Sequence, residues 1–134
     1  MNVLVDTSVW SLALRRKVSN DAPEVGELRA LIEEGRVVMM GAIRQELLSG
    51  IRVPEHFKRL RDGLRAFPDL LLDAEDYEEG AVCFNRCRSR GLQGSNTDFL
   101  LCAVARRRRV AVLTTDRDFT GFARVLDVDL HQIR

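Results

Sequence analysis

Histidine, cysteine, lysine and long apolar runs are all scarce in this sequence of 134 residues. It has two histidines, three cysteines and two lysines, and no apolar stretch approaches the roughly 20 residues that a membrane-spanning helix needs. The odd number of cysteines excludes a complete disulfide framework. The N-terminus has no basic region followed by a long apolar run, so it predicts no secretory signal. We therefore expect a cytoplasmic protein that does not contact membranes.

The cysteines leave one alternative open, which is a zinc site. Cys83 and Cys87 are four residues apart and would share a helix face, as zinc ligands can. Neither His56 nor His131 stands at a ligand spacing from them. Because Cys83, Cys87 and Cys102 all lie among apolar residues, we interpret them as small buried side chains in a reducing compartment.

Positive charge is carried almost entirely by arginine, with 19 arginines against two lysines and a net charge of +1. Arginine presents a planar fork of donors that suits phosphate groups, although a GC-rich genome also enriches arginine. The length fits a single domain over residues 1–134. With 46% hydrophobic and 31% charged residues, the composition is that of an ordinary folded domain and names no partner.

Short apolar runs alternate with helical patterns along the whole chain. The runs predict strands, and the stretches between them predict helices. The expected strands are 3–5, 37–40, 70–72, 110–113 and 128–130, and the expected helices are 9–14, 23–34, 42–48, 54–67, 74–90, 95–109 and 120–123. Since no tight hairpin signal appears, this order predicts a three-layer α/β/α sandwich with a central, mainly parallel sheet of four to five strands.

Two aspartates follow expected strands. Asp6 ends the first apolar run, and Asp116 comes after the run 110–113. The carboxyl ends of parallel strands meet at one edge of a sheet, where ligands bind, so we expect both side chains at that edge. The alternatives are that Asp6 caps the first helix and that Asp116 is a turn residue.

Two further carboxylates interrupt apolar patterns. The helical spacing places Glu46 on the apolar stripe of its helix beside Ile43, although an edge position paired with an arginine is the alternative. Asp98 opens a helix that is apolar on all sides and therefore buried. Its spacing from Ser95 also fits a capping box that serves only the helix end. If these alternatives held at all four carboxylates, four coincidences would have to point at one edge, so we expect the four to converge.

Converging carboxylates need a cation, because packed carboxylates raise one another's pKa unless a positive charge neutralises them. Oxygen ligands without histidine or cysteine favour Mg²⁺, with Mn²⁺ as a substitute, over zinc. The three aspartates are the expected metal ligands, and Glu46 would orient a water or a second ion. The hydroxyls of Thr7, Ser8 and Thr115 flank the cluster and are expected to hold a water or a phosphate oxygen.

This ordered set of residues resembles a PIN-domain nuclease, and the compact length resembles the toxin of a VapBC toxin–antitoxin pair. The resemblance covers the whole chain and depends on Asp6-Thr7-Ser8, Glu46, Asp98 and Thr115-Asp116-Arg117-Asp118-Phe119. It implies that the catalytic acidic quartet is Asp6, Glu46, Asp98 and Asp116, with Asp118 as an accessory residue. It also implies RNA cleavage that inhibits translation, a homodimer, and inhibition by a small antitoxin protein.

Cleavage at such a site would use a water activated by the metal, leaving a 5′-phosphate and a 3′-hydroxyl. The residues expected to contact the RNA backbone are Arg44, Arg86, Arg88, Arg90 and Arg117. The densest basic run, Arg106 to Arg109, is interpreted as a solvated helix end, because cations favour the negative end of the helix dipole. Contact of this run with RNA is the alternative.

Two other functions are alternatives. A non-catalytic PIN-like module that binds RNA or a partner protein would keep the same fold. A metal-dependent phosphatase also places an aspartate after a parallel strand, but it needs a lysine near the phosphoryl group. Neither Lys17 nor Lys58 follows a strand, which disfavours the phosphatase.

Overall fold

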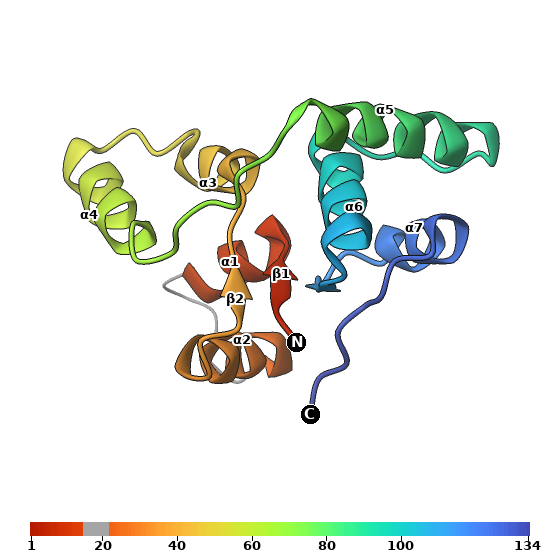
Figure 1. Cartoon of the computed structure of the whole chain (residues 1–134). Coiled ribbons are helices and arrows are strands. Elements are labelled where there is room, and N and C mark those ends of the chain that lie inside the picture. Colours follow the sequence, from red (N-terminus) through yellow and green to blue (C-terminus); the bar gives the residue numbers. More distant parts are fainter. Residues whose placement is uncertain (15–21) are drawn as a thin grey trace.

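A short parallel sheet lies at the centre of the computed structural model, which describes residues 1–14 and 22–134 (Figure 1). Its strand order is β2-β1-β3, with β1 at Val3–Val5, β2 at Val37–Val38 and β3 at Ala111–Leu113. Val3 pairs in parallel with Val37 on one side and with Ala111 on the other. The α/β fold with a parallel sheet is therefore confirmed.

The sheet has three strands in the described residues, whereas four to five were expected. Single parallel bridges extend it on both sides and join Met39 to Asp69 and Val112 to Leu130. The expected strands at 70–72 and 128–130 are wrong, because the chain leaves the sheet after one pairing on each side. Leu71, inside the first of these runs, is 89% exposed and has no strand neighbour to pack on.

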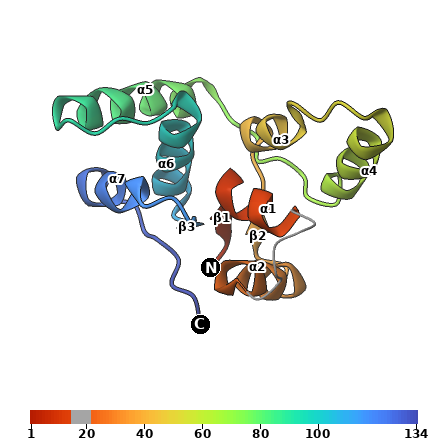
Figure 2. The same cartoon turned by 180° about the vertical axis from the view of Figure 1, so that it is seen from behind.

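Seven helices surround the sheet in the part of the chain that the structure describes. Figure 1 shows α1 to α4 on one side of the sheet and α5 to α7 on the other, and Figure 2 shows the same halves from behind. None of these helices is long and apolar enough to cross a membrane. Their bounds are α1 Thr7–Leu14, α2 Pro23–Glu33, α3 Gly41–Leu48, α4 Pro54–Leu64, α5 Ala74–Ser89, α6 Asn96–Arg108 and α7 Asp118–Leu126.

The core forms where β1 and α6 pack against their neighbours. All three residues of β1 are fully buried, and α6 is buried from Phe99 through Ala105, as its uniformly apolar sequence predicts. α5 crosses α6 closely, because a Cβ added to Gly80 would lie 3.4 Å from the Cα atom of Leu100. This burial fixes the orientation of α6 and therefore of Asp98 in its first turn.

The three cysteines are buried and free, which supports their interpretation as core side chains. Burial raises the pKa of Cys83, Cys87 and, most strongly, Cys102. A thiol with a raised pKa is a poor nucleophile and a poor metal ligand at neutral pH. The described residues contain no group of three or more histidine, cysteine or acidic side chains that could hold a metal by themselves, which disfavours the zinc alternative.

A buried ion pair joins the start of α5 to the end of α6. The carboxylate of Asp76 is fully buried, and it accepts from Arg107 Nη1 at 2.5 Å and from Arg108 Nη2 at 2.8 Å. Arg107 also pairs with the exposed Glu75 at 3.0 Å. The interpretation of Arg106 to Arg109 as a solvated helix end is therefore wrong for the two central arginines, which hold two helices together.

Candidate active site

Asp6 stands where β1 ends and α1 begins, and it is only 6% exposed. Its Oδ2 accepts hydrogen bonds from Ser8 Oγ at 2.7 Å and from Thr114 Oγ1 at 2.9 Å. The backbone N–H of Asp6 donates to the carbonyl of Leu113 at 2.9 Å, so the end of β1 is tied to the end of β3. These contacts fix the carboxylate at the carboxyl edge of the sheet.

Thr114 is the residue that sequence reasoning missed beside Asp6. The expected hydroxyl was that of Thr115, but this residue is exposed and contributes its backbone N–H, which donates to Ser8 Oγ at 3.1 Å. The Oγ1 atom of Thr114 also accepts from the backbone N–H of Asp116 at 3.0 Å. No local pattern separated the two threonines, because all three residues of the strand before them are buried and show no alternation.

Asp98 has two roles in the geometry of α6. It closes a capping box, because its Oδ2 accepts from the backbone N–H of Ser95 at 3.0 Å while Ser95 Oγ accepts from the N–H of Asp98 at 3.1 Å. Burial raises the pKa of Asp98, and the negative charges of Asp6 and Asp116 raise it further, against the lowering effect of the Ser95 bonds. The capping box is therefore present, and the negative charges of Asp6 and Asp116 act on the same carboxylate.

Asp116 follows β3 and precedes α7. Its Oδ1 accepts a hydrogen bond from the backbone N–H of Asp118 at 2.9 Å. Asp116 is therefore a turn residue, as its alternative interpretation predicts. Asp116 also faces the same cavity as Asp6 and Asp98. The side chain of Asp118 is exposed and does not line this cavity.

Glu46 reaches the cavity from α3 and accepts from Thr7 Oγ1 at 2.6 Å. The expectation that it interrupts the apolar stripe is wrong, because Glu46 is exposed and the buried residues of α3 are Ile43 and Leu47. Glu46 therefore stands at an exposed edge, as the alternative expected, but its partner is Thr7 of α1 and not an arginine. The neighbouring α1 makes that edge one wall of a cavity.

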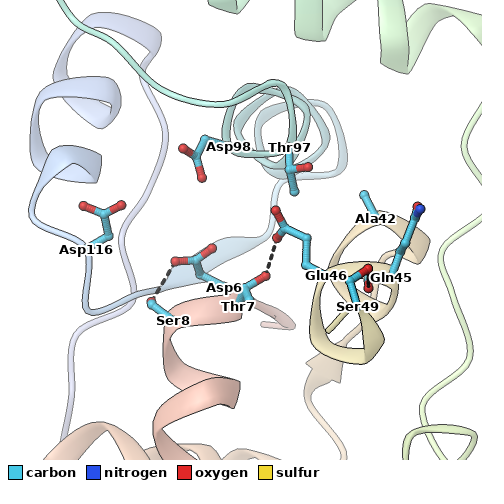
Figure 3. A pocket seen from close by; sticks show the side chains of 10 residues that line it. All are labelled: Asp6, Thr7, Ser8, Ala42, Gln45, Glu46, Ser49, Thr97, Asp98 and Asp116. Carbon is cyan, nitrogen blue, oxygen red and sulfur yellow. Dashed lines mark hydrogen bonds between the residues drawn. The ribbon is translucent and has the colours of Figure 1, made fainter. Parts of the chain in front are cut away.

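One cavity of about 660 Å³ brings these groups together (Figure 3). Figure 3 shows the carboxylates of the four acidic residues around it, carried by the end of β1, by α3, by the first turn of α6 and by the segment before α7. The lining residues are Asp6, Thr7, Ser8, Ala42, Gln45, Glu46, Ser49, Thr97, Asp98 and Asp116. Sequence reasoning missed Thr97, Gln45 and Ser49, which are near Asp98 or Glu46 along a helix.

The donor set of this cavity fits a hard divalent cation. The side-chain donor atoms that line it are oxygen atoms of carboxylates, hydroxyls and one amide. Among the described residues, no histidine, lysine or arginine lines the cavity. No three acidic groups there stand close enough to enclose a metal by themselves. Mg²⁺ does not require such a cluster, because it usually keeps several waters and takes only one or two carboxylates directly.

The arginines expected to contact RNA fall into two groups. Arg44 is occupied within the fold, because its Nη2 pairs with Asp69 at 2.9 Å and its Nη1 donates to the carbonyl of Leu64 at 3.0 Å. Arg86 donates to a backbone carbonyl of α7, and Arg88, Arg90 and Arg117 are exposed. The geometry therefore assigns Arg44 a structural contact and leaves the exposed arginines as candidates for RNA binding.

Comparison with known proteins identifies the architecture. The PIN domain family matches residues 3–125 of the chain. The chain belongs to the PIN-domain family. A VapC ribonuclease of Mycobacterium bovis and Ribonuclease VapC11 of Mycobacterium tuberculosis are each 30% identical to this PIN domain over 134 residues, covering 98% of it and 99% of the relative.

Solved structures share the fold of this PIN domain. FitAcB from Neisseria gonorrhoeae superposes with a TM-score of 0.75 at 23% identity, covering 97% of this chain and 96% of the other. VapBC2 from Rickettsia felis, bound to a DNA fragment from its promoter, superposes with a TM-score of 0.77 at 16% identity, covering 98% of both chains. At these identities the likeness establishes the fold, so the activity has to be argued from the site.

Proposed function

We propose that this PIN domain is a metal-dependent endoribonuclease and the toxin of a type II toxin–antitoxin pair. The observation that carries the proposal is the meeting of Asp6, Glu46, Asp98 and Asp116 around one open cavity that no basic residue of the described chain lines. A phosphodiester and four carboxylates repel one another, so the cavity suits a nucleic acid only together with a cation. The names of the VapC relatives support RNA as the substrate.

Asp6, Asp98 and Asp116 would hold Mg²⁺, or Mn²⁺ in its place, together with the waters that such an ion usually keeps. When bound, such an ion lowers the pKa of a water and neutralises charge that develops on the phosphate. Ser8 and Thr114 hold the carboxylate of Asp6 in one orientation through its Oδ2 atom. Thr7 holds Glu46 at the opposite wall, where its second carboxylate oxygen can orient a water.

The products are expected to carry a 5′-phosphate and a 3′-hydroxyl. Among the described residues, no histidine or lysine lines the cavity that could remove the proton of the ribose 2′-hydroxyl and so let its oxygen attack the phosphorus. Within the described residues the phosphatase alternative also lacks its lysine, because Lys58 lies on α4 and does not line the cavity. Lys17 lies outside the described residues.

Asp6→Asn and Asp98→Asn should each lower the rate of Mg²⁺-dependent RNA cleavage on the order of a hundredfold or more. Asparagine keeps the hydrogen-bond acceptors that Ser8 and Ser95 need, so the fold should survive. Gel assays of RNA with Mg²⁺ or with EDTA measure the rate, and circular dichroism checks folding. Asp62→Asn, on the exposed face of α4, is the control.

Three results separate this proposal from its alternatives. Cleavage at the wild-type rate by a folded Asp98→Asn protein would refute the assignment of the site. RNA binding without cleavage, unchanged by Asp6→Asn, would support a non-catalytic module. Turnover of a simple phosphate ester with intact RNA would support a phosphatase.

As a toxin, the protein should be a homodimer in the cytoplasm that a small antitoxin inhibits. The relatives are named VapC and the Rickettsia felis neighbour VapBC2, which supports a second component as a partner here. Expression should arrest translation, and co-expression of the product of a short adjacent gene should relieve the arrest. Light scattering of the purified protein measures the number of subunits.

A further inference from the structure

A second cavity of about 290 Å³ lies beside the first turn of α6. It is lined by Phe84, Arg88, Leu92, Gln93, Gly94 and Phe99. Phe99 directly follows Asp98 in α6, so the same helical turn has the carboxylate cavity on one side and this cavity on the other. The cavity is too small for a helix of a partner protein, because one helical turn, about 10 Å wide and about 5 Å long, would exceed its volume. A single planar ring fits it.

Aromatic rings form a rigid wall for this cavity. The rings of Phe84 and Phe99 meet edge to face at 5.4 Å, and Phe99 lies 4.8 Å from Phe122 of α7. Gly94 lets the loop before α6 lie directly on these rings, because a Cβ there would come within 2.8 Å of Phe122 and 3.1 Å of Phe99. The half-buried ring of Phe84 therefore has a fixed orientation before any ligand arrives.

Positive charge is concentrated at the end of α5, from which Arg88 lines the cavity. Arg86 and Arg88 occupy the last turn of α5 and Arg90 follows it, all three exposed. The guanidinium carbon of Arg88 lies 5.9 Å from the centre of the Phe84 ring. This edge of the molecule attracts phosphates, whereas the carboxylate cavity repels them unless a cation is bound. A nucleic acid would therefore make its cation-independent contacts here.

We propose that this cavity binds one unpaired nucleobase of the RNA, stacked on Phe84 and on the guanidinium plane of Arg88. Bases of single-stranded RNA stack on aromatic rings and on arginine planes, and amide side chains read their edges. Gln93, exposed at the mouth, supplies such an amide. The assignment rests on the proposed ribonuclease function for its substrate class, and it adds a base subsite next to the cleavage site.

The test uses single-stranded RNA of about ten nucleotides that carries 2-aminopurine at successive positions. In EDTA, where the RNA is bound but not cut, wild-type protein should quench the fluorescence at one position by stacking. Phe84→Leu, which keeps the apolar bulk and removes the ring face, should abolish this quenching and weaken binding about tenfold. Arg88→Lys should keep the salt dependence of binding but lose the quenching. Arg29→Ala on α2, at the opposite end of the molecule from α5 (Figure 1), should change neither.

A second measurement changes the RNA and combines that change with the Phe84→Leu variant. RNA that lacks the base at the quenched position should bind wild-type protein as weakly as intact RNA binds Phe84→Leu, and the two changes together should cost no more than either alone. Quenching that is equal at all positions, or that survives Phe84→Leu, would overturn the base subsite. So would a change in subunit number in Phe84→Leu, because the cavity would then face a second copy of the chain.

The outcomes for the two proposals are separate. Position-dependent quenching without any cleavage in Mg²⁺ would leave the base subsite standing and refute the nuclease. Cleavage without position-dependent quenching would do the reverse.

Discussion

At the scale of single residues, the acidic cavity shows how one carboxylate can serve the fold and the site together. Asp98 caps α6 through its hydrogen bond with Ser95. Burial raises the pKa of Asp98, and the negative charges of Asp6 and Asp116 raise it further. A carboxyl whose pKa is higher in the folded protein than in the unfolded chain binds more protons when folded. Its contribution to stability is therefore favourable at acid pH and is lost as pH rises through the interval between the two pKa values.

Asp98→Asn should stabilise the metal-free protein at neutral pH, because it removes a charge that the fold disfavours while keeping the acceptor for Ser95. The fall in the free energy of unfolding from acid to neutral pH should also become shallower than in the wild type. Urea denaturation in EDTA across this pH range measures both effects. Asp118→Asn, exposed and outside the cavity, should change neither, and a loss of stability in Asp98→Asn would show that its capping role outweighs repulsion.

At the scale of elements, most of the helices expected from the sequence are confirmed, whereas two of the five expected strands are wrong. The ranges expected for α2 to α6 match within a few residues, because each carries its own apolar periodicity and its own start and stop signals. α7 runs from Asp118 to Leu126, longer than the expected 120–123. The runs 70–72 and 128–130 have strand-like residues, but the bridges there are single ones, made by Asp69 just before the first run and by Leu130 at the end of the second. No local pattern reveals this.

The Asp76 ion pair should be essential for the packing of α5 on α6. Asp76→Ala leaves the guanidinium groups of Arg107 and Arg108 without their buried partner and removes half of a capping box, so we expect a loss of about 3 kcal/mol or more in the free energy of unfolding. Urea denaturation measures it. Glu75→Ala removes only an exposed partner of Arg107 and should have little effect. Equal effects of the two changes would contradict the role of burial.

At the scale of the whole molecule, the last residues of the chain are tied to α2. Glu27 is 5% exposed, and it contacts His131 Nε2 at 2.7 Å and Arg134 Nη2 at 3.1 Å. The hydrogen bonds from Arg134, together with that from His131, lower the pKa of Glu27 from 4.5 to about 2 despite its burial. This carboxylate therefore stabilises the fold above its ordinary pKa, and the contribution is lost as pH falls from about 4.5 toward 2.

Glu27→Gln should therefore lower the melting temperature at pH 7 and change it little at the acid end of this range. Arg134→Ala should act in the same direction, because it removes the largest cause of the lowered pKa. Melting temperatures from pH 7 down to about pH 2 test the sign of the effect. A uniform decrease at every pH would instead indicate lost packing.

The amino-acid pattern alone was enough for the parallel α/β class, the buried strand β1, the apolar helix α6 and the placement of Asp6, Asp98 and Asp116 at element ends. These features are local, since each depends on periodicity or on the residue that follows an apolar run. The tertiary structure alone decided that Thr114 rather than Thr115 supports Asp6, that Arg44 and Arg107 are occupied within the fold, and that Glu46 stands on an exposed edge. Each of those outcomes depends on contacts between residues far apart in the chain, whose geometry is set only when the helices pack around the sheet.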